Sequence, residues 1–423
     1  MLYLYRHKRM EEKAIIKEVG SMVECIYQSK GCSNKVNQNI HDGTRLKFQA
    51  FEHYTVAWLE KVLGYPGYKD YRYFNFIDCM ASSGLYFDAK RSKEFEEGTA
   101  IRIFKIFSGY AKKYKHLEFT VYMNDYDSQF VRCLQCNKEK YIPEDIPNLH
   151  IGLYTLDKYD FIRSIDKKTP HMGKYSKSLI VYDPYDVDFD WTYLHAFLHL
   201  DADYLITHFF PNDAKRNIHT KNEEVICRYE KAYGMKFSEI KKVFDHGNTP
   251  IERNQLFREA LRKQLLKYSD KHSYAYTPVF LDHKLHIYDI IVLSYSTYGQ
   301  ELLKNTMYRL YRDREQAIEK NVQQEFDLFS TTEEDIYVKD RRSGISEFEF
   351  HYADEHIIKM FCEAFKGQML TKEDFRERLR RHPYLPTNVL NMVKKVWKYE
   401  IVKREENGKT IVYYKFSERG LYE

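Results

Sequence analysis

Short apolar runs alternate with helix-length amphipathic stretches from about residue 44 to about residue 300. A helix is predicted at Thr44–Leu63, where apolar side chains recur every three or four residues until Gly64, Pro66 and Gly67 end it. Seven apolar runs of strand length follow, at Tyr73–Cys79, Glu118–Asn124, Leu149–Leu153, Ser178–Tyr182, Tyr204–Phe210, Pro278–Lys284 and Asp289–Ser294. Helical stretches separate the first five, at Thr99–Tyr114, Ser128–Lys138, Asp157–Ile165 and Tyr193–Leu200. Buried strands that alternate with helices predict an α/β fold in three layers around a mostly parallel sheet.

The last two of these strands lie close together in the sequence, so we predict that they pair antiparallel. Five parallel strands that end in such a pair are the arrangement of class I methyltransferases, a Rossmann-like fold. Between the fifth and sixth strands lies a highly charged stretch, at about 220–270, which is typical of a helical insertion. Residues 44–330 are therefore predicted to be one methyltransferase-like domain, preceded by a helical segment at 1–43.

The pattern changes again toward the C-terminus. His356–Phe365 is apolar with helical spacing. Thr371 with Asp374 three residues later has the form of a capping box and predicts a second helix to about Arg381. A third helix is predicted at Thr387–Lys398. Two strands joined through Asn407-Gly408 carry a strong hairpin signal. Three helices followed by a hairpin predict a winged helix at 354–423, joined to the first domain by a linker at 331–353.

Composition narrows the class of protein. Hydrophobic residues make up 43% of the 423 residues, which excludes wholesale disorder. Mean hydropathy is -0.65, no apolar run approaches the roughly 18 residues of a membrane span, and the N-terminus turns polar too early for a signal peptide. Seven cysteines are few and odd in number, which favours a reducing, cytoplasmic location.

The sequence contains one close pair of cysteines, Cys133 and Cys136. A four-thiolate zinc site needs a second pair, so no metal site is predicted. We expect both residues to lie on one side of a helix as core cysteines.

The first candidate strand ends in Asp78 and runs into a turn of small residues that contains Ser82, Ser83 and Gly84. Small residues let a backbone approach a ligand closely. The turn resembles the first motif of S-adenosylmethionine-dependent methyltransferases, an acidic-x-x-x-Gly-x-Gly turn, except that only Gly84 is glycine. The resemblance implies that Asp78, Ser83 and Gly84 contact the methionine part of the cofactor. An ordinary strand-to-helix turn is the alternative.

Acidic residues also follow the second and third strands. Asp125 comes after the second, where an ionised carboxylate can accept both ribose hydroxyls of an adenosine. Asp127 is a second choice for this role, with capping of the next helix as its alternative. Asp157 follows the third strand, where a polar residue of this fold often contacts the adenine amino group. The alternative role of Asp157 is to cap the N-terminus of a helix.

Asp183-Pro184-Tyr185 follows the fourth strand. It resembles the Asp-Pro-Pro-Tyr motif of amino-methyltransferases, in which the acid and a proline carbonyl accept from the target amine while the aromatic ring stacks on the base. One proline is missing here. The resemblance implies catalytic roles for Asp183 and Tyr185.

After the fifth strand, Lys215 and Arg216 are candidates for phosphate contact. The alternative is that they belong to a solvated loop.

The predicted winged helix carries most of the net charge of +5, since residues 354–423 hold 15 Lys and Arg against 11 Asp and Glu, a net of +4. On its third helix, four polar residues recur at steps of three or four and share a face with Lys394 beside them: Asn388, Asn391, Lys395 and Lys398. Asn can read adenine edges and Lys can reach phosphate or guanine, which predicts nucleic-acid binding. Its core side is predicted to be Val389, Met392, Val393, Val396 and Trp397. Contact with protein is the alternative use of this module.

The order of the motifs resembles the three-Cys-motif partner (TcmP) family of prokaryotes and phages. The resemblance runs from about Thr44 to about Arg312, through Thr44-Arg45-Leu46-Lys47, Ile77 to Tyr86, Gly98-Thr99-Ala100, Asp183-Pro184-Tyr185 with Trp191, Phe209 to Asp213, and Tyr288 to Ser296 with Gly299 and Met307. It implies a class I methyltransferase fold. It also implies a partner that carries three cysteines and is similar to radical S-adenosylmethionine proteins.

Three functions fit the sequence. The first is S-adenosylmethionine-dependent methyl transfer to nucleic acid. The second is a catalytically silent scaffold that binds the three-cysteine partner and DNA, which the missing glycine and proline favour. The third is a hydrolase or nuclease that uses Asp78, Asp125 and Asp183 around a divalent ion.

Overall fold

The computed structural model describes residues 40–418, with gaps at 41, 65–69, 89–93, 169–174, 247–249, 272, 282–284, 313–353, 383 and 407. Nearly all of the helical segment predicted at 1–43, and the whole of the linker predicted at 331–353, lie outside the described residues. In the described residues no helix combines the length and the apolarity that crossing a bilayer requires.

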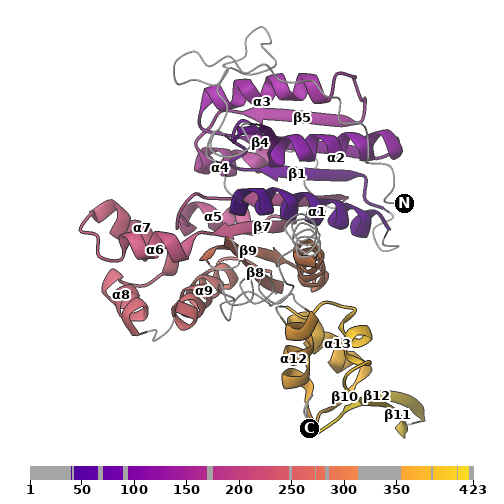
Figure 1. Ribbon diagram of the computed structural model, residues 1–423. Helices are drawn as coiled ribbons and strands as arrows, with labels where there is room; N and C mark the ends of the chain where they lie inside the picture. Colours follow the sequence, from indigo (N-terminus) through magenta and orange to yellow (C-terminus); the bar gives the residue numbers. More distant parts are fainter. Residues whose placement is uncertain are drawn as a thin grey trace, which may run out of the picture.

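A seven-stranded sheet forms the centre of the protein, in the order β5-β4-β1-β6-β7-β9-β8 (Figure 1). Its strands are β1 (Tyr73–Asp78), β4 (Glu118–Asn124), β5 (Leu149–Tyr154), β6 (Ser176–Tyr182), β7 (Asp203–His208), β8 (Ser273–Leu281) and β9 (Leu285–Ser294). The first five are parallel, whereas β9 is antiparallel to both β7 and β8. This order and this one reversed strand define a class I methyltransferase-like fold, so the predicted fold class is confirmed. The last two strands start earlier in the sequence than predicted.

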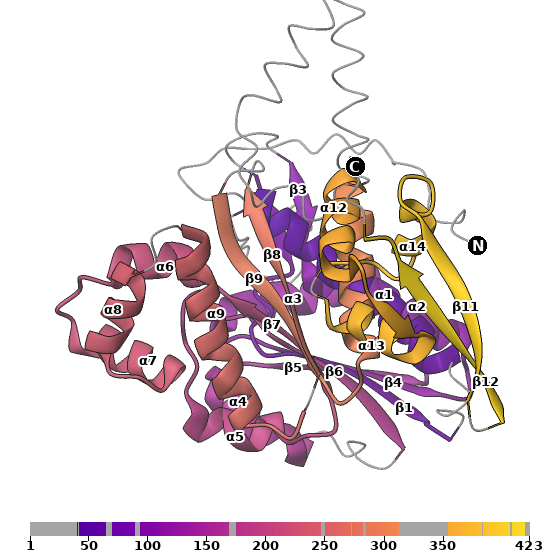
Figure 2. The same cartoon turned by 90° about the horizontal axis from the view of Figure 1, so that it is seen from below.

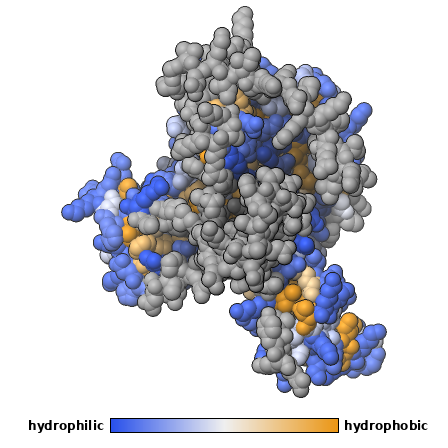
Figure 3. Space-filling view, viewed as in Figure 1, coloured by the Kyte–Doolittle hydropathy of each residue, from blue (hydrophilic) through white to orange (hydrophobic). Residues whose placement is uncertain are grey.

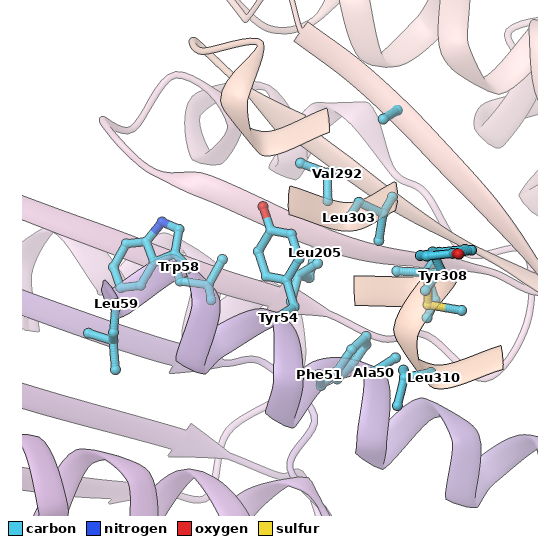
Figure 4. Packing of buried hydrophobic residues seen from close by; sticks show 14 of the residues in the cluster. Ala50, Phe51, Tyr54, Trp58, Leu59, Leu205, Val292, Leu303, Tyr308 and Leu310 are labelled. Carbon is cyan, nitrogen blue, oxygen red and sulfur yellow. The ribbon is translucent and has the colours of Figure 1, made fainter. Parts of the chain in front are cut away.

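Helices cover both faces of the sheet because alternate strand residues point to opposite sides. Phe74 and Phe76 pack on one face under α1 (Asp42–Gly64), α2 (Thr99–Lys113), α3 (Ser128–Tyr141) and a helix at 298–312 that was not predicted. Ile77 packs on the other face with α4 (Lys158–Lys168) and α5 (Trp191–Leu198). Tyr54 of α1 and Leu303 of the helix at 298–312 belong to one buried cluster, part of which Figure 4 shows. The core of this face therefore joins the beginning of the domain to its end.

Helices also fill the region after β7, which stands to one side of the sheet in Figure 1. They are α6 (Phe210–Asn217), α7 (Glu223–Tyr233), α8 (Phe237–His246) and α9 (Pro250–Lys267), so the stretch expected as a helical insertion is helical. A buried ion pair fixes α9 to the sheet: Arg258 Nε lies 2.7 Å from Asp289 Oδ2, and Arg258 Nη2 donates to Asp289 Oδ1 over 2.9 Å. A small hairpin of β2 (Leu85–Phe87) and β3 (Phe95–Glu97) follows β1 and was not predicted.

Residues 354–418, here called the C-terminal module, form a separate set of elements (Figure 2). In chain order they are α12 (Asp354–Phe365), β10 (Met369–Thr371), α13 (Lys372–Arg381), α14 (Val389–Val393), β11 (Tyr399–Glu406) and β12 (Lys409–Phe416). The strands form a sheet in the order β10-β12-β11. Thr371 Oγ1 caps α13 by accepting from the Asp374 amide at 3.0 Å.

The helix predicted at Thr387–Lys398 is wrong in its length, because α14 spans only Val389–Val393. The amides of Val396 and Trp397 both donate to the Val393 carbonyl at 2.9 Å, so the chain turns and brings Trp397 into the core. The prediction of Val396 as a core residue is also wrong, since its side chain is 54% exposed. Several β-branched residues in this stretch favour helix weakly, which lets tertiary packing of Trp397 end the helix early.

The C-terminal module packs directly on the helix at 298–312. Lys304 is buried, and its Nζ donates to the carbonyls of Leu379 at 2.6 Å and Arg380 at 3.0 Å. The Thr387 amide donates to Asn305 Oδ1 at 3.1 Å, and the Tyr308 hydroxyl donates to Asp354 at 2.8 Å. These contacts fix the module on the α/β domain.

Candidate active site

Three carboxylates meet at the carboxyl edge of the sheet, because β4, β1 and β6 are neighbouring parallel strands. Asp78 is the last residue of β1, while Asp125 and Asp183 directly follow β4 and β6. Burial raises the pKa of Asp78 to about 7; the Met80 amide, which donates to Oδ1 at 2.9 Å, opposes this, and the charges of Asp183 and Asp125 add to it. The structure therefore brings together the acids that the sequence placed at three separate strand ends.

The turn after β1 places its backbone against these acids. Ser82 has a φ of 57° and Gly84 a φ of 72°, both in the left-handed region that favours glycine. A Cβ on Gly84 would lie only 2.9 Å from Leu134 Cδ1, so the packing of α3 also requires glycine there. Ser83 is fully buried and its hydroxyl donates to the Leu85 carbonyl at 2.7 Å. The side chain of Ser83 thus supports the turn, and the Ser83 carbonyl accepts from Asn137 Nδ2 at 3.0 Å.

Asp125 holds the turn in place while keeping acceptor capacity. Its Oδ2 accepts from the Ser82 amide and its Oδ1 from the Asp127 amide, both at 2.9 Å. Each carboxylate oxygen has two lone-pair sites, so Asp125 can still accept from a ligand hydroxyl. Asp127 accepts from the Gln129 amide at 2.9 Å, which is the capping role weighed for it from the sequence.

The residue before Asp125 joins three strand ends and was missed in the sequence. Asn124 Nδ2 donates to the carbonyls of Cys79 at 3.1 Å and Leu156 at 3.0 Å, and its Oδ1 accepts from the Leu156 amide. A polar residue at the end of an apolar strand is the signal that could have found Asn124.

Asp157 is exposed and accepts from the Tyr159 amide at 2.8 Å in the first turn of α4. It therefore caps α4, the alternative role considered for it from the sequence.

Asp183 forms an ion pair with a residue from the first helix. Lys47 Nζ of α1 lies 2.5 Å from Asp183 Oδ2, and the Thr207 hydroxyl at the end of β7 donates to Asp183 Oδ1. The ammonium also lies 5.4 Å from the ring centre of Phe209 and 5.9 Å from that of Tyr288. Lys47 belongs to one of the motifs that carry the family resemblance, but its local sequence predicts no role for it.

Two tyrosines at this edge are exposed to solvent. Tyr126 follows Asp125 and is 78% exposed, and Tyr185 follows Asp183 and is 75% exposed. Because β1 separates β4 from β6, the two residues flank the end of β1 on either side. Aromatic rings in this position can stack on planar ligands.

Two ion pairs hold α1 beside this edge. Arg45 lies 2.5 Å from Asp88, just after β2, and 2.6 Å from Glu96 of β3. The hairpin that follows the turn is thus tied to the helix that carries Lys47.

The remaining predicted residues lie on other elements. Lys215 and Arg216 belong to α6 and not to a loop; Arg216 is exposed, and the side chain of Lys215 is outside what the structure describes. Five residues of the C-terminal module are all exposed, as nucleic-acid contact requires: Asn388, Asn391, Lys394, Lys395 and Lys398. Cys133 and Cys136 are buried on α3 as expected.

A cavity of about 440 Å³ lies beside the loop after β6, but none of the three carboxylates lines it. Its walls come from that loop and from α4 and α7, and they carry Asp188, Asp190, Glu223, Glu224, Arg228 and Lys231. The excess of acids disfavours a polyanion there. We therefore place the candidate active site at the carboxylates and the small-residue turn.

No family model matches the chain, and no curated protein matches it in sequence. Among solved structures, a complex of Trm1 from Pyrococcus horikoshii with S-adenosyl-L-methionine matches with a TM-score of 0.33 and 11% identity. The match covers 66% of this chain and 64% of that chain, so this chain spans less than two thirds of that neighbour's length. A likeness this distant does not bear on the site, which has to be judged from its own geometry.

Proposed function

We propose that the protein is an S-adenosylmethionine-dependent methyltransferase that acts on nucleic acid. The observation that carries the proposal is the meeting of Asp78, Asp125 and Asp183 around a small-residue turn. Open α/β sheets bind their ligands beyond the carboxyl ends of the strands, where these groups lie.

The residues present fit this cofactor. The backbone of the tight turn at Ser82, Ser83 and Gly84 would meet the methionine part. Asp78 would face the amino group, and Asp125 would accept from the ribose hydroxyls. Among the described side chains of the site, three acids stand against the ammonium of Lys47, and this excess of acids suits a sulfonium ligand even though burial raises the pKa of Asp78 to about 7. The cofactor supplies an activated methyl group on sulfur.

Asp183 and Tyr185 would orient the methyl acceptor. Asp183 is held by two contacts, so its position is fixed before any acceptor binds. Tyr185 is exposed beside it and offers a ring on which an unstacked base can lie. Orientation of this kind lowers the barrier of a transfer that needs little base strength.

We further propose that the C-terminal module is a winged helix that contacts the nucleic acid. Basic side chains are exposed along the turn after α14 and the β11–β12 hairpin: Lys394, Lys395, Lys398, Lys403, Arg404, Lys409 and Lys415. In the space-filling view of Figure 3, hydrophilic residues cover much of the module. Since α14 has only five residues, the turn and the hairpin would supply more of the phosphate contacts than a recognition helix would.

The order of motifs supports membership of the three-Cys-motif partner family, and we propose a three-cysteine, radical-S-adenosylmethionine-like protein as partner and a cytoplasmic location. A catalytically silent scaffold for that partner and DNA is the other candidate. Cofactor binding separates the two functions.

The test is calorimetric titration of the purified chain with S-adenosylmethionine. We expect micromolar affinity, and Asp125→Ala should weaken it by about 1.5–3 kcal/mol, the range for losing hydrogen bonds to a charged group. Asp145→Ala removes an exposed carboxylate from the loop before β5 and should bind like the wild type. Absence of any binding heat with the wild type would favour the scaffold.

A further inference from the structure

Lys47, a hydrogen-bond donor, and Asp183, a hydrogen-bond acceptor, lie side by side where the candidate site would hold the methyl acceptor. Lys47 Nζ and Asp183 Oδ2 are 2.5 Å apart, and the two side chains are 12% and 16% exposed. An ammonium has three N–H groups and a carboxylate about four lone-pair sites. Each group therefore keeps capacity for a ligand after the contacts it already makes.

The position of Lys47 is set by its surroundings as well as by Asp183. Phe209 and Tyr288 place their rings 5.4 and 5.9 Å from its ammonium, and the Tyr288 hydroxyl donates to the Gly43 carbonyl at 2.5 Å. Tyr288 thus ties the start of α1 to β9. The ammonium is held at the site before a ligand arrives.

An exocyclic amine and a hydroxyl, two kinds of methyl acceptor in nucleic acids, differ in what they offer such a pair. An exocyclic amine conjugated to a base offers two N–H donors, so it needs acceptors as partners. A hydroxyl offers one donor and two lone pairs, so one donor and one acceptor satisfy it while a lone pair stays free to react. Asp183-Pro184-Tyr185 is one proline shorter than the amine-binding motif, and Lys47 adds a donor beside it.

We propose that this site methylates a hydroxyl and that the acceptor polymer is RNA, whose ribose 2′-hydroxyl DNA lacks. The inference rests on the methyltransferase function proposed above. Lys47 donates to the hydroxyl oxygen and stabilises the negative charge that develops there, while Asp183 accepts the hydroxyl proton. With S-adenosylmethionine as donor, the O–C bond forms as the C–S bond breaks, the electron pair stays on sulfur, and the proton passes through Asp183 to solvent.

A carboxylate is a weak base, yet it is sufficient in this step. The hydroxyl proton becomes strongly acidic as the oxygen bonds to carbon, so its late transfer to Asp183 is favourable. Lys47 takes no part in the proton transfer and acts by electrostatic stabilisation. Asp183 and Lys47 therefore have different roles, which variants can separate.

The first test measures binding and needs no cofactor. Full-length protein is titrated into a short fluorescent single-stranded RNA and into the same sequence in 2′-deoxy form. The wild type should prefer RNA by about tenfold, the value of one hydrogen bond to a charged group, and Lys47→Met should remove the preference. Lys61→Met, which changes an exposed lysine of the same helix, should keep it. Equal RNA preference in wild type and Lys47→Met would overturn the role of Lys47.

The second test locates the methyl group. Label from a tritiated methyl donor should enter RNA and not DNA, and it should remain in alkali-resistant dinucleotides because a 2′-O-methyl ribose cannot assist backbone cleavage. Lys47→Met should lower the rate by about 10²-fold while its affinity for S-adenosylmethionine stays within about twofold, and Lys47→Arg should retain part of the rate. Label in a base, or equal label in DNA, overturns the hydroxyl inference and leaves methyl transfer standing. No label in either polymer removes the proposed function and this inference with it.

Discussion

At the scale of single residues, burial of the Asp78 carboxyl in the candidate site opposes stability. It is 3% exposed, and its pKa rises from 3.8 to about 7, mainly through burial. The folded state therefore binds a proton between pH 3.8 and 7 that the unfolded state has released. By linkage, the free energy of unfolding falls as pH rises through this window. The full loss of stability from ionising the buried Asp78 carboxyl is reached above pH 7.

Asp78→Asn should accordingly stabilise the protein most at high pH. We expect urea unfolding to show a gain of up to about 4 kcal/mol at pH 8, and about 2 kcal/mol less at pH 5.5, from about 1.4 kcal/mol for each pKa unit. Affinity for S-adenosylmethionine should fall in the same variant, since stability and binding compete at such a site. Asp145→Asn is the control and should change neither. A gain of equal size at both pH values would contradict the assignment.

The residues of the site differ in how far the sequence could predict them. Asp78, Asp125 and Asp183 were predicted because each acid ends an apolar strand, which is a local pattern. Lys47 was assigned no role because its partner Asp183 lies 136 residues away, and no local pattern reports that contact. The fold, not the neighbouring sequence, brings Lys47 into the candidate site.

At the scale of elements, the end of α13 depends on a lysine from another part of the chain. Lys304 donates to two carbonyls of the last turn of α13, which would otherwise be buried without partners. Burial lowers the pKa of Lys304 from 10.5 to about 7, so the folded state disfavours its charge. The free energy of unfolding should therefore rise between pH 7 and pH 10.5 on account of this group.

Lys304→Ala should destabilise the protein because it leaves both carbonyls buried and unsatisfied. We expect a loss of about 2–4 kcal/mol from the lost hydrogen bonds and the cavity left behind, measured by urea unfolding at pH 10. The loss should be smaller at pH 8, because there the variant also removes the cost of discharging the buried lysine. The neighbouring Asn305→Ala removes exposed contacts to Thr387 and should cost less. Equal and small losses in both variants would mean that solvent reaches the end of α13.

The ends of helices and strands could be predicted where local sequence sets them, and could not where packing with distant residues does. Glu118–Asn124 was predicted to the residue, since an apolar run with clear ends is a strong strand signal. The helix at 298–312 was missed although it carries buried Leu303 and Met307, because Gly299 in its first turn argues against helix. The early end of α14 was missed because it depends on where Trp397 packs.

At the scale of the whole molecule, the C-terminal module and the α/β domain share one connected core. Buried residues of the module such as Phe361 and Trp397 belong to the same cluster as Leu303 and Met307 of the helix at 298–312. The module should therefore not unfold independently. A winged helix on a loose tether would behave differently.

We expect urea unfolding to be one cooperative transition. Trp397 fluorescence, in a variant with Trp58→Phe and Trp191→Phe, should change at the same urea concentration as the far-ultraviolet circular dichroism of that variant. Wild-type circular dichroism serves as the control for the two substitutions. A Trp397 transition at clearly lower urea would show that the module melts first.

The insertion of β9 between β7 and β8 has a consequence for synthesis on the ribosome. The edge of β7 stays unpaired until the chain as far as Ser294 has emerged, since β9 supplies its partner residues. During that interval a nascent chain presents Leu205 and Ile206 on an open strand edge, a surface prone to associate with other chains. Translation of α6 to α9 therefore delays closure of the sheet, and this is the stage at which chaperones would be most needed.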